Sequence, residues 1–124
     1  DQVMALESTI FGKPKTKENA IEQLMALRGK KHQLITGVAI VSDSKTVTFS
    51  NETILEIRKN LTEKEIETYV NHELPLNCAG SYKVEGMGIA LFESINTTDF
   101  TSIIGLPLME LSKKLKDFNI DVLQ

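Results

Sequence analysis

The segment NCAGSYKVEGMG, residues 77–88, combines three glycines with side chains that can bind a ligand. Glycine permits a positive φ and a close approach of the backbone to a bound group, and backbone N–H groups in such a loop can hold an anion. Lys83 adds a positive charge, and an ionised Glu85 accepts hydrogen bonds from the N–H edge of a guanine-like base. These features predict a ligand-binding loop; an ordinary glycine turn between a helix and a strand is the alternative.

Two further candidates for chemistry lie near the N-terminus. Lys13 stands between Gly12 and Pro14. Glycine lets the backbone approach a ligand and proline stiffens the loop, so the Lys13 ammonium can be held toward a phosphate. Asp1 precedes an apolar run, and a carboxylate at a strand end can bind Mg²⁺ or accept a proton from water. A lysine in a surface turn and a solvated terminal carboxylate are the alternatives, which composition alone favours.

The single cysteine and the two histidines carry weaker signals. Cys78 has no basic neighbour in the sequence to activate it, so we expect a small packed side chain rather than a nucleophile. His32 and His72 are isolated and lack the spacing of metal ligands. We expect His72, at the end of a predicted helix, to contact solvent or the helix dipole.

Length and composition restrict the class of protein. The 124 residues fit one domain, residues 1–124, with 41% hydrophobic and 25% charged residues, which is ordinary for a globular chain. A net charge of -3 argues against a surface that coats nucleic acid, but leaves room for a local basic pocket. A single cysteine, no signal peptide and no long apolar run predict a reducing, cytoplasmic setting without membrane insertion.

Helices and strands alternate along the sequence, which predicts an α/β or α+β fold with a mixed sheet flanked by helices. Strands are predicted at 2–6, 32–42, 46–59 (as one strand or two) and 88–95, with a loop at 7–16 and a turn at 42–45. Helices are predicted at 17–28, from the capping box TEKE at 62–65 to a point before Pro75, and at 106–118. The last helix is expected to bury Leu108, Leu111, Leu115 and Phe118.

The order DQV, GKP, TGVAIV, TEKEIETYV, PLNCAGSYKVEGMGIALFE and IIGLPLMEL resembles the Maf family of nucleoside triphosphate pyrophosphatases across nearly all of the chain. DQ followed by NCAGSYKVEGMGIALFE is similar to the subfamily that hydrolyses 7-methyl-GTP. Relatives that act on dTTP and UTP typically carry Thr after the aspartate and Gln in place of Glu85. The resemblance implies a twisted mixed sheet of the Maf and inosine triphosphatase type.

The resemblance also implies a reaction. Water attacks the α-phosphate with help from Mg²⁺ or Mn²⁺, releasing a nucleoside monophosphate and pyrophosphate. Asp1 would be the proton acceptor or share the metal, and Lys13 would bind the triphosphate. Gln2 and Glu85 match positions associated with base selection, and Lys83 is expected to add a substrate contact. A homodimer is a further expectation, to which the apolar segment TSIIGLPLM would contribute unless it belongs to the core.

One departure from the family pattern affects the expected activity. The family's N-terminal segment carries a Ser-x-Ser-x-Arg type motif, and nothing in residues 1–124 matches it. We therefore expect a longer parent protein, and weak or no turnover by these residues alone. A dTTP or UTP pyrophosphatase and a catalytically silent nucleotide-binding module are the competing interpretations.

Overall fold

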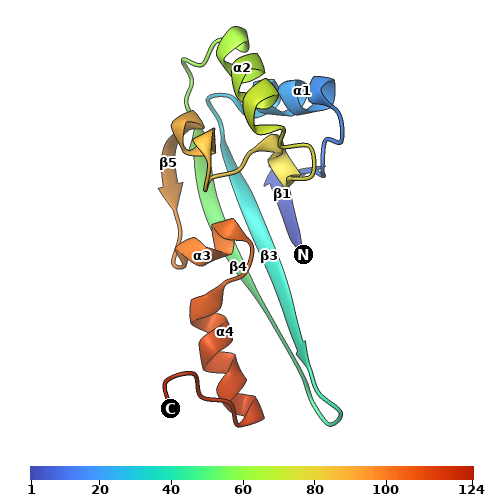
Figure 1. Cartoon of the computed structure of the whole chain (residues 1–124), viewed down its shortest axis with the longest axis vertical. Coiled ribbons are helices and arrows are strands. Elements are labelled where there is room, and N and C mark those ends of the chain that lie inside the picture. Colours follow the sequence, from blue (N-terminus) through green and yellow to red (C-terminus); the bar gives the residue numbers. More distant parts are fainter.

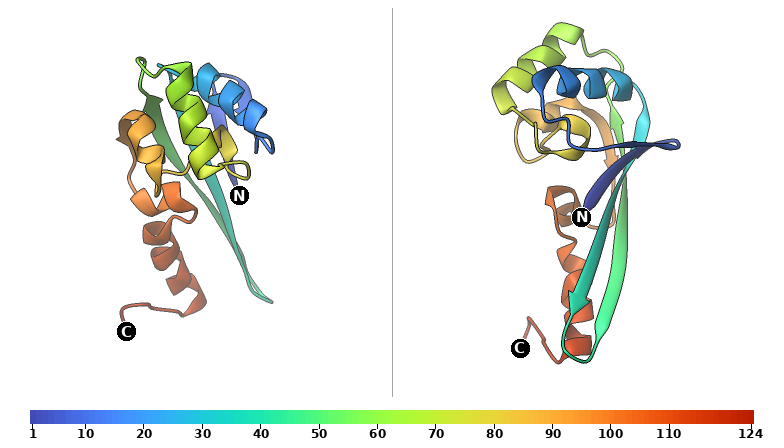
Figure 2. Two further views of the ribbon diagram at one scale, coloured as in Figure 1. Left: turned by 45° about the horizontal axis from the view of Figure 1, so that its top comes forward. Right: turned by 90° about the vertical axis from the view of Figure 1, so that its right-hand side faces the viewer.

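The computed structural model describes residues 1–124 as a five-stranded sheet with its helices on one side (Figures 1 and 2). The strands are β1 (Gln2–Leu6), β2 (Thr9–Phe11), β3 (Lys31–Val41), β4 (Thr46–Ile57) and β5 (Phe92–Asn96), in the order β2-β1-β3-β4-β5. The α-helices are α1 (Lys17–Leu27), α2 (Glu63–Glu73), α3 (Phe100–Ile104) and α4 (Leu108–Lys114). Three 3₁₀ helices complete the chain: η1 (Ala79–Ser81), η2 (Met87–Leu91) and η3 (Leu115–Phe118).

The long hairpin of β3 and β4 is the central element of the sheet. Its strands pair from Lys31 with Glu56 to Val41 with Thr46, and residues 42–45 make the predicted turn. Residues 46–57 therefore form one strand, which decides between the two alternatives for this stretch. The α/β class is confirmed; within it, all four strand pairs are antiparallel rather than mixed, and the one parallel contact is the bridge between Arg28 and Ile57.

One face of the sheet is covered by α1 and α2 (Figure 2). Alternate residues of a strand point to the same face, and on the covered face His32, Leu34 and Thr36 of β3 are all buried. Met4 of β1 and Leu55 of β4 lie in the same core, with no exposed surface. The main contributions from the helices are Leu24, Leu27, Ile66 and Val70.

Local signals placed both covering helices correctly. The Thr16 side chain caps α1 by accepting a hydrogen bond from the Asn19 N–H at 3.1 Å. At α2, Thr62 Oγ1 accepts from the Glu65 N–H at 3.1 Å, and the Thr62 N–H donates to Glu65 Oε1 at 2.9 Å. The predicted capping box is thus confirmed, and it satisfies two backbone donors that the first helical turn leaves free.

A buried polar cluster lies between β1, β3 and the segment after α2. The Tyr82 hydroxyl donates to Met4 Sδ at 3.0 Å and lies 3.1 Å from His32 Nε2. His32 is only 2% exposed, and its Nδ1 has no hydrogen-bond partner. Burial lowers the pKa of His32 from 6.5 to about 4, a shift that the nearby Lys30 backbone partly opposes. The imidazole is therefore neutral at pH 7.

Three expectations about the elements need correction. The predicted 7–16 loop contains β2, which pairs with β1. The predicted 88–95 strand begins only at Phe92, because residues 87–91 form η2. The 106–118 helix is divided into α4 and η3, and α3 precedes it without having been predicted.

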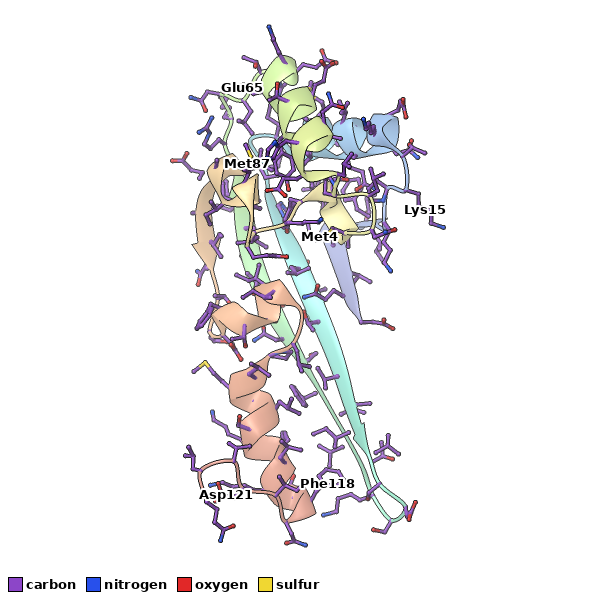
Figure 3. All side chains as sticks on the ribbon, viewed as in Figure 1. Met4, Lys15, Glu65, Met87, Phe118 and Asp121 are labelled. Atoms are coloured by element: carbon purple, nitrogen blue, oxygen red, sulfur yellow. The ribbon has the colours of Figure 1, made fainter.

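The buried stripe predicted for the last helix is wrong. Leu108 is 48% exposed, and no residue of α4 or η3 is fully buried. Both helices lie along the distal half of the β3–β4 hairpin, where Lys45 Nζ donates to the Asp117 carbonyl at 2.6 Å and lies over the Phe118 ring (Figures 1 and 3). Much of TSIIGLPLM is also open to solvent, including Ile104 and Met109.

No helix combines the length and apolar character needed to cross a bilayer.

Candidate active site

A cavity of about 260 Å³ at the end of β1 brings together four of the predicted site residues: Asp1, Gln2, Lys13 and Glu85. Its remaining lining is largely apolar and comprises Leu34, Asn77, Cys78, Ala79, Tyr82, Val84, Ile103 and Ile104. Two carboxylates, one ammonium and one amide therefore share a cavity with an apolar wall. Its volume is slightly below the roughly 300–1,000 Å³ of typical ligand sites, so a larger ligand would extend past the rim, where Asp1 and Lys13 are exposed.

Strand pairing positions Asp1 and Gln2. Asp1 exchanges two backbone hydrogen bonds with Gly37 of β3: the Gly37 N–H donates to the Asp1 carbonyl at 2.8 Å, and the Asp1 nitrogen donates to the Gly37 carbonyl at 3.0 Å. Asp1 is exposed and so lies at the rim of the cavity. The half-buried Gln2 follows it directly in β1.

Side chains of α1 hold the backbone on both sides of Lys13. Gln23 Nε2 donates to the Gly12 carbonyl at 3.1 Å, and Asn19 Nδ2 donates to the Pro14 carbonyl at 3.1 Å. The loop is therefore anchored, as predicted for GKP, but the anchors come from a helix rather than from proline alone. Lys13 itself is exposed and forms no salt bridge, so its charge is available to an anion.

The loop that carries Glu85 is held by α2. The Lys83 N–H donates to the Tyr69 hydroxyl at 2.8 Å, and the Met87 N–H donates to the Glu73 carboxylate. Figure 3 shows Met87 close to the lower part of α2. A Cβ added to Gly88 would lie 2.0 Å from the Lys83 carbonyl oxygen, so glycine is required for the loop to close on itself.

Lys83 does not line the cavity. Its ammonium donates to the Glu73 carbonyl at 3.4 Å, at the C-terminal end of α2, where a positive charge is favoured by the helix dipole. The predicted contact between Lys83 and a substrate therefore stays a prediction. In the structure, the Lys83 ammonium interacts with the end of α2 instead.

Gln23 connects the Lys13 loop with the segment that follows α2. While its Nε2 bonds to the Gly12 carbonyl, its Oε1 accepts from the Ser81 hydroxyl at 2.6 Å. Ser81 and Gly80 both have positive φ, 69° and 77°, and a Cβ on Gly80 would lie 2.7 Å from Met4 Cε. Sequence reasoning missed Gln23, Tyr69 and Glu73 as positioning residues, because no local motif links them to the loops they hold.

Cys78 lines the cavity but is a poor nucleophile. Partial burial raises the pKa of its thiol, and the nearby charge of Lys83 opposes that shift only in part. The neutral thiol therefore dominates at pH 7. This agrees with the expectation of a small packed side chain, although the thiol is only half-buried.

The residues of the cavity fit a hard divalent cation only if the ligand completes its coordination. No three His, Cys, Asp or Glu side chains form a group that could hold a metal ion. Asp1 and Glu85 are the two carboxylates that line the cavity. Mg²⁺ is usually bound by one or two carboxylates together with substrate phosphates and water, and this donor set is compatible with that pattern.

Comparison with known proteins identifies a family model and several relatives that match this chain. The family model described as Maf-like protein matches residues 1–118. The 7-methyl-GTP pyrophosphatase of Bdellovibrio bacteriovorus is 45% identical over 120 residues, which are 97% of this chain and 63% of that protein. The dTTP/UTP pyrophosphatases of Bacillus cereus (strain G9842) and Bacillus anthracis are 45% identical over 122 residues, 98% of this chain and again 63% of theirs. The chain thus spans less than two thirds of the length of these relatives.

Proposed function

This chain belongs to the family of Maf-like proteins, and from that premise we propose that its protein hydrolyses a nucleoside triphosphate to a nucleoside monophosphate and pyrophosphate. The observation that carries the proposal is the shared cavity of Asp1, Gln2, Lys13 and Glu85. Glu85 is far from the other three in the sequence, and the four have the chemical characters that such a substrate requires. The relatives named as pyrophosphatases support the same reaction class.

In the proposed mechanism, Lys13 binds the triphosphate and stabilises the charge that develops on it. Its freedom from ion pairs and its anchored loop favour this role, because the ammonium needs little rearrangement to meet the anion. Asp1 at the rim accepts a proton from the attacking water. A bound Mg²⁺ or Mn²⁺, held by Asp1 and phosphate oxygens, would supply Lewis-acid stabilisation of the phosphoryl charge.

The substrate we favour is 7-methyl-GTP. Methylation at N7 gives the guanine ring a positive charge, which attracts the Glu85 carboxylate more than a neutral glutamine. The carboxylate also accepts from the guanine N1–H and exocyclic amine, and charge-assisted hydrogen bonds are roughly twice as strong as neutral ones. The dTTP/UTP relatives, at equal identity, make dTTP and UTP the second candidates.

The test is pyrophosphate release by the full-length protein from 7-methyl-GTP, GTP, dTTP and UTP, with Mg²⁺ or Mn²⁺ and with EDTA. We expect turnover with 7-methyl-GTP to be fastest, and Lys13→Ala to reduce kcat/KM by about 100-fold, as expected for the loss of a group that stabilises transition-state charge. Lys15→Ala is the matched control, because Lys15 is exposed on the same loop and does not line the cavity. Equal kcat/KM for the Lys13 and Lys15 variants would refute the role of Lys13.

Glu85→Gln tests the base preference separately. We expect it to reduce the preference for 7-methyl-GTP over GTP, because only the methylated ring carries the positive charge that the carboxylate attracts. An unchanged ratio of the two kcat/KM values would show that Glu85 does not read the methylated base. Release of nucleoside monophosphate from none of the four nucleotides would leave the nucleotide-binding module as the better interpretation.

A further inference from the structure

We propose that Thr36 is a positioning residue for Gln2: together with the Ser102 carbonyl, it turns the Gln2 amide so that only the carbonyl oxygen is left for a ligand. An oxygen in that position selects a base edge that is rich in N–H donors. The chemistry of selection rests on the proposed function. The orientation of the amide does not, and can be tested without any nucleotide.

The register of β1 and β3 brings Gln2 and Thr36 together. They are direct partners across the antiparallel pair. The neighbouring pair, Asp1 and Gly37, exchanges both backbone hydrogen bonds, so Gln2 and Thr36 form a non-hydrogen-bonded pair, in which opposing side chains lie closest. Both side chains also lie on the same face of the sheet.

The two amide hydrogens of Gln2 are both used within the protein. Gln2 Nε2 donates to Thr36 Oγ1 at 2.9 Å and to the Ser102 carbonyl at 2.6 Å. A backbone carbonyl can only accept, so the atom that faces Ser102 must be the amide nitrogen, and the reverse orientation would place two oxygens in contact. The Gln2 carbonyl oxygen has no protein donor among the side-chain hydrogen bonds.

The acceptors of these two contacts belong to buried residues, although Gln2 itself is half-buried. Thr36 is 1% exposed, and Ser102 has no exposed surface. The Ser102 hydroxyl lies 3.3 Å from Thr36 Oγ1, so it can donate a second hydrogen bond to the same oxygen. A hydrogen bond without competing water is stronger than one at the surface, and breaking it leaves a buried polar group unsatisfied. The amide is therefore held in one orientation before a ligand arrives.

Beside the Asp1 carboxylate, the lining of the cavity consequently includes two acceptors, the Gln2 carbonyl oxygen and the Glu85 carboxylate. Guanine presents adjacent donors at N1 and at its exocyclic amine. Uracil and thymine present one donor, N3–H, between two carbonyl oxygens that a second acceptor would repel. Repulsion between an acceptor of the cavity and a carbonyl oxygen of the base discriminates strongly against that base where the cavity has an apolar wall. This pair of acceptors therefore favours a guanine-type edge.

The decisive comparison is Thr36→Val against Thr53→Val. Both remove one fully buried threonine hydroxyl from the same sheet, and neither residue lines the cavity. Thr53, however, bonds to Thr97 Oγ1 rather than to Gln2. We expect Thr36→Val to lower the ratio of kcat/KM for 7-methyl-GTP over dTTP by roughly three- to tenfold, the usual worth of one hydrogen bond. Thr36→Ser is expected to restore the ratio, and Thr53→Val to leave it within twofold.

Equal ratios for the Thr36→Val and Thr53→Val variants would overturn the proposal. Hydrogen exchange of the Gln2 side-chain NH₂, followed by NMR, provides the readout that needs no turnover. We expect slow exchange in the wild type and in Thr53→Val, and faster exchange in Thr36→Val. If the wild-type NH₂ exchanges as fast as that of the exposed Gln124, the orientation is wrong. If it is protected but no nucleotide is hydrolysed, only the proposed function fails.

Discussion

Acid is expected to destabilise the protein through His32 in particular. The pKa of this buried imidazole is lowered from 6.5 to about 4 by burial, so between these values the unfolded chain binds a proton that the folded chain does not. Stability is thus fully present above pH 6.5, declines as the pH falls toward 4, and levels off below. From these two pKa values, His32 accounts for a loss of about 2.5 kcal/mol between pH 7.5 and pH 4.5.

The assay is urea unfolding of the wild type and of His32→Phe at pH 7.5 and pH 4.5. Phenylalanine keeps a ring beside Tyr82 and Phe92 but cannot titrate. Its lost hydrogen bond to Tyr82 lowers stability at both pH values and cancels in the difference. We expect the wild type to lose about 2.5 kcal/mol more than the variant over this pH interval. His72→Phe is the control, because His72 is exposed, and it should lose as much as the wild type.

Two results would refute this reasoning. One is equal losses of unfolding free energy for the wild type and His32→Phe. The other is a titration of the His32 ring, followed by NMR in the folded wild type, with a midpoint near 6.5. The NMR titration decides the matter even if the phenylalanine variant does not fold.

Three further outcomes are expected. Gly88→Ala should lower the unfolding free energy by several kcal/mol, since its Cβ would overlap the Lys83 carbonyl, whereas Gly37→Ala, with open space around it, should be near neutral; thermal unfolding compares the two. Thr62→Ala should cost about 1 kcal/mol in urea unfolding, because it removes a helix cap; no change would discount the cap. Alkylation of Cys78 at pH 7 should be slower than that of a free thiol, because its pKa is raised, and bound nucleotide should slow it further; mass spectrometry measures both rates.

Elements specified by neighbouring residues could be predicted from the sequence. The capping box at Thr62 and Glu65, and the turn at 42–45, depend on contacts within a few residues. Burial could not be predicted in the same way for the stripe of Leu108, Leu111, Leu115 and Phe118. The spacing of these residues shows which side of the helix is apolar, but not which element covers that side. Residues 88–91 were predicted as the start of a strand, and nothing within that stretch shows that Gly88 lies against the Lys83 carbonyl, where a Cβ would not fit.

The membership of the site was easier to predict than its support. Charge and hydrogen-bonding capacity pointed to Asp1, Lys13 and Glu85, the family resemblance added Gln2, and the structure brings all four to one cavity. Their roles remain predictions. The groups that hold their loops come from the neighbouring helices α1 and α2, and no local motif links them to those loops, so nothing in the sequence around Gln23 or Tyr69 identifies them. The same is true of Thr36, whose polar side chain within an apolar strand was the one available hint.

The Gln23 amide has a consequence for inhibitor design. One end of this side chain is bonded to the Gly12 carbonyl and the other to the Ser81 hydroxyl. The Lys13 loop, proposed to bind phosphate, and the segment that leads to Glu85, proposed to contact the base, therefore share a tether. A compound that immobilises one of them lowers the entropic penalty for ordering the other. Small anions and flat heterocycles are therefore expected to bind with positive cooperativity, and joining such halves would start from two mutually reinforcing leads.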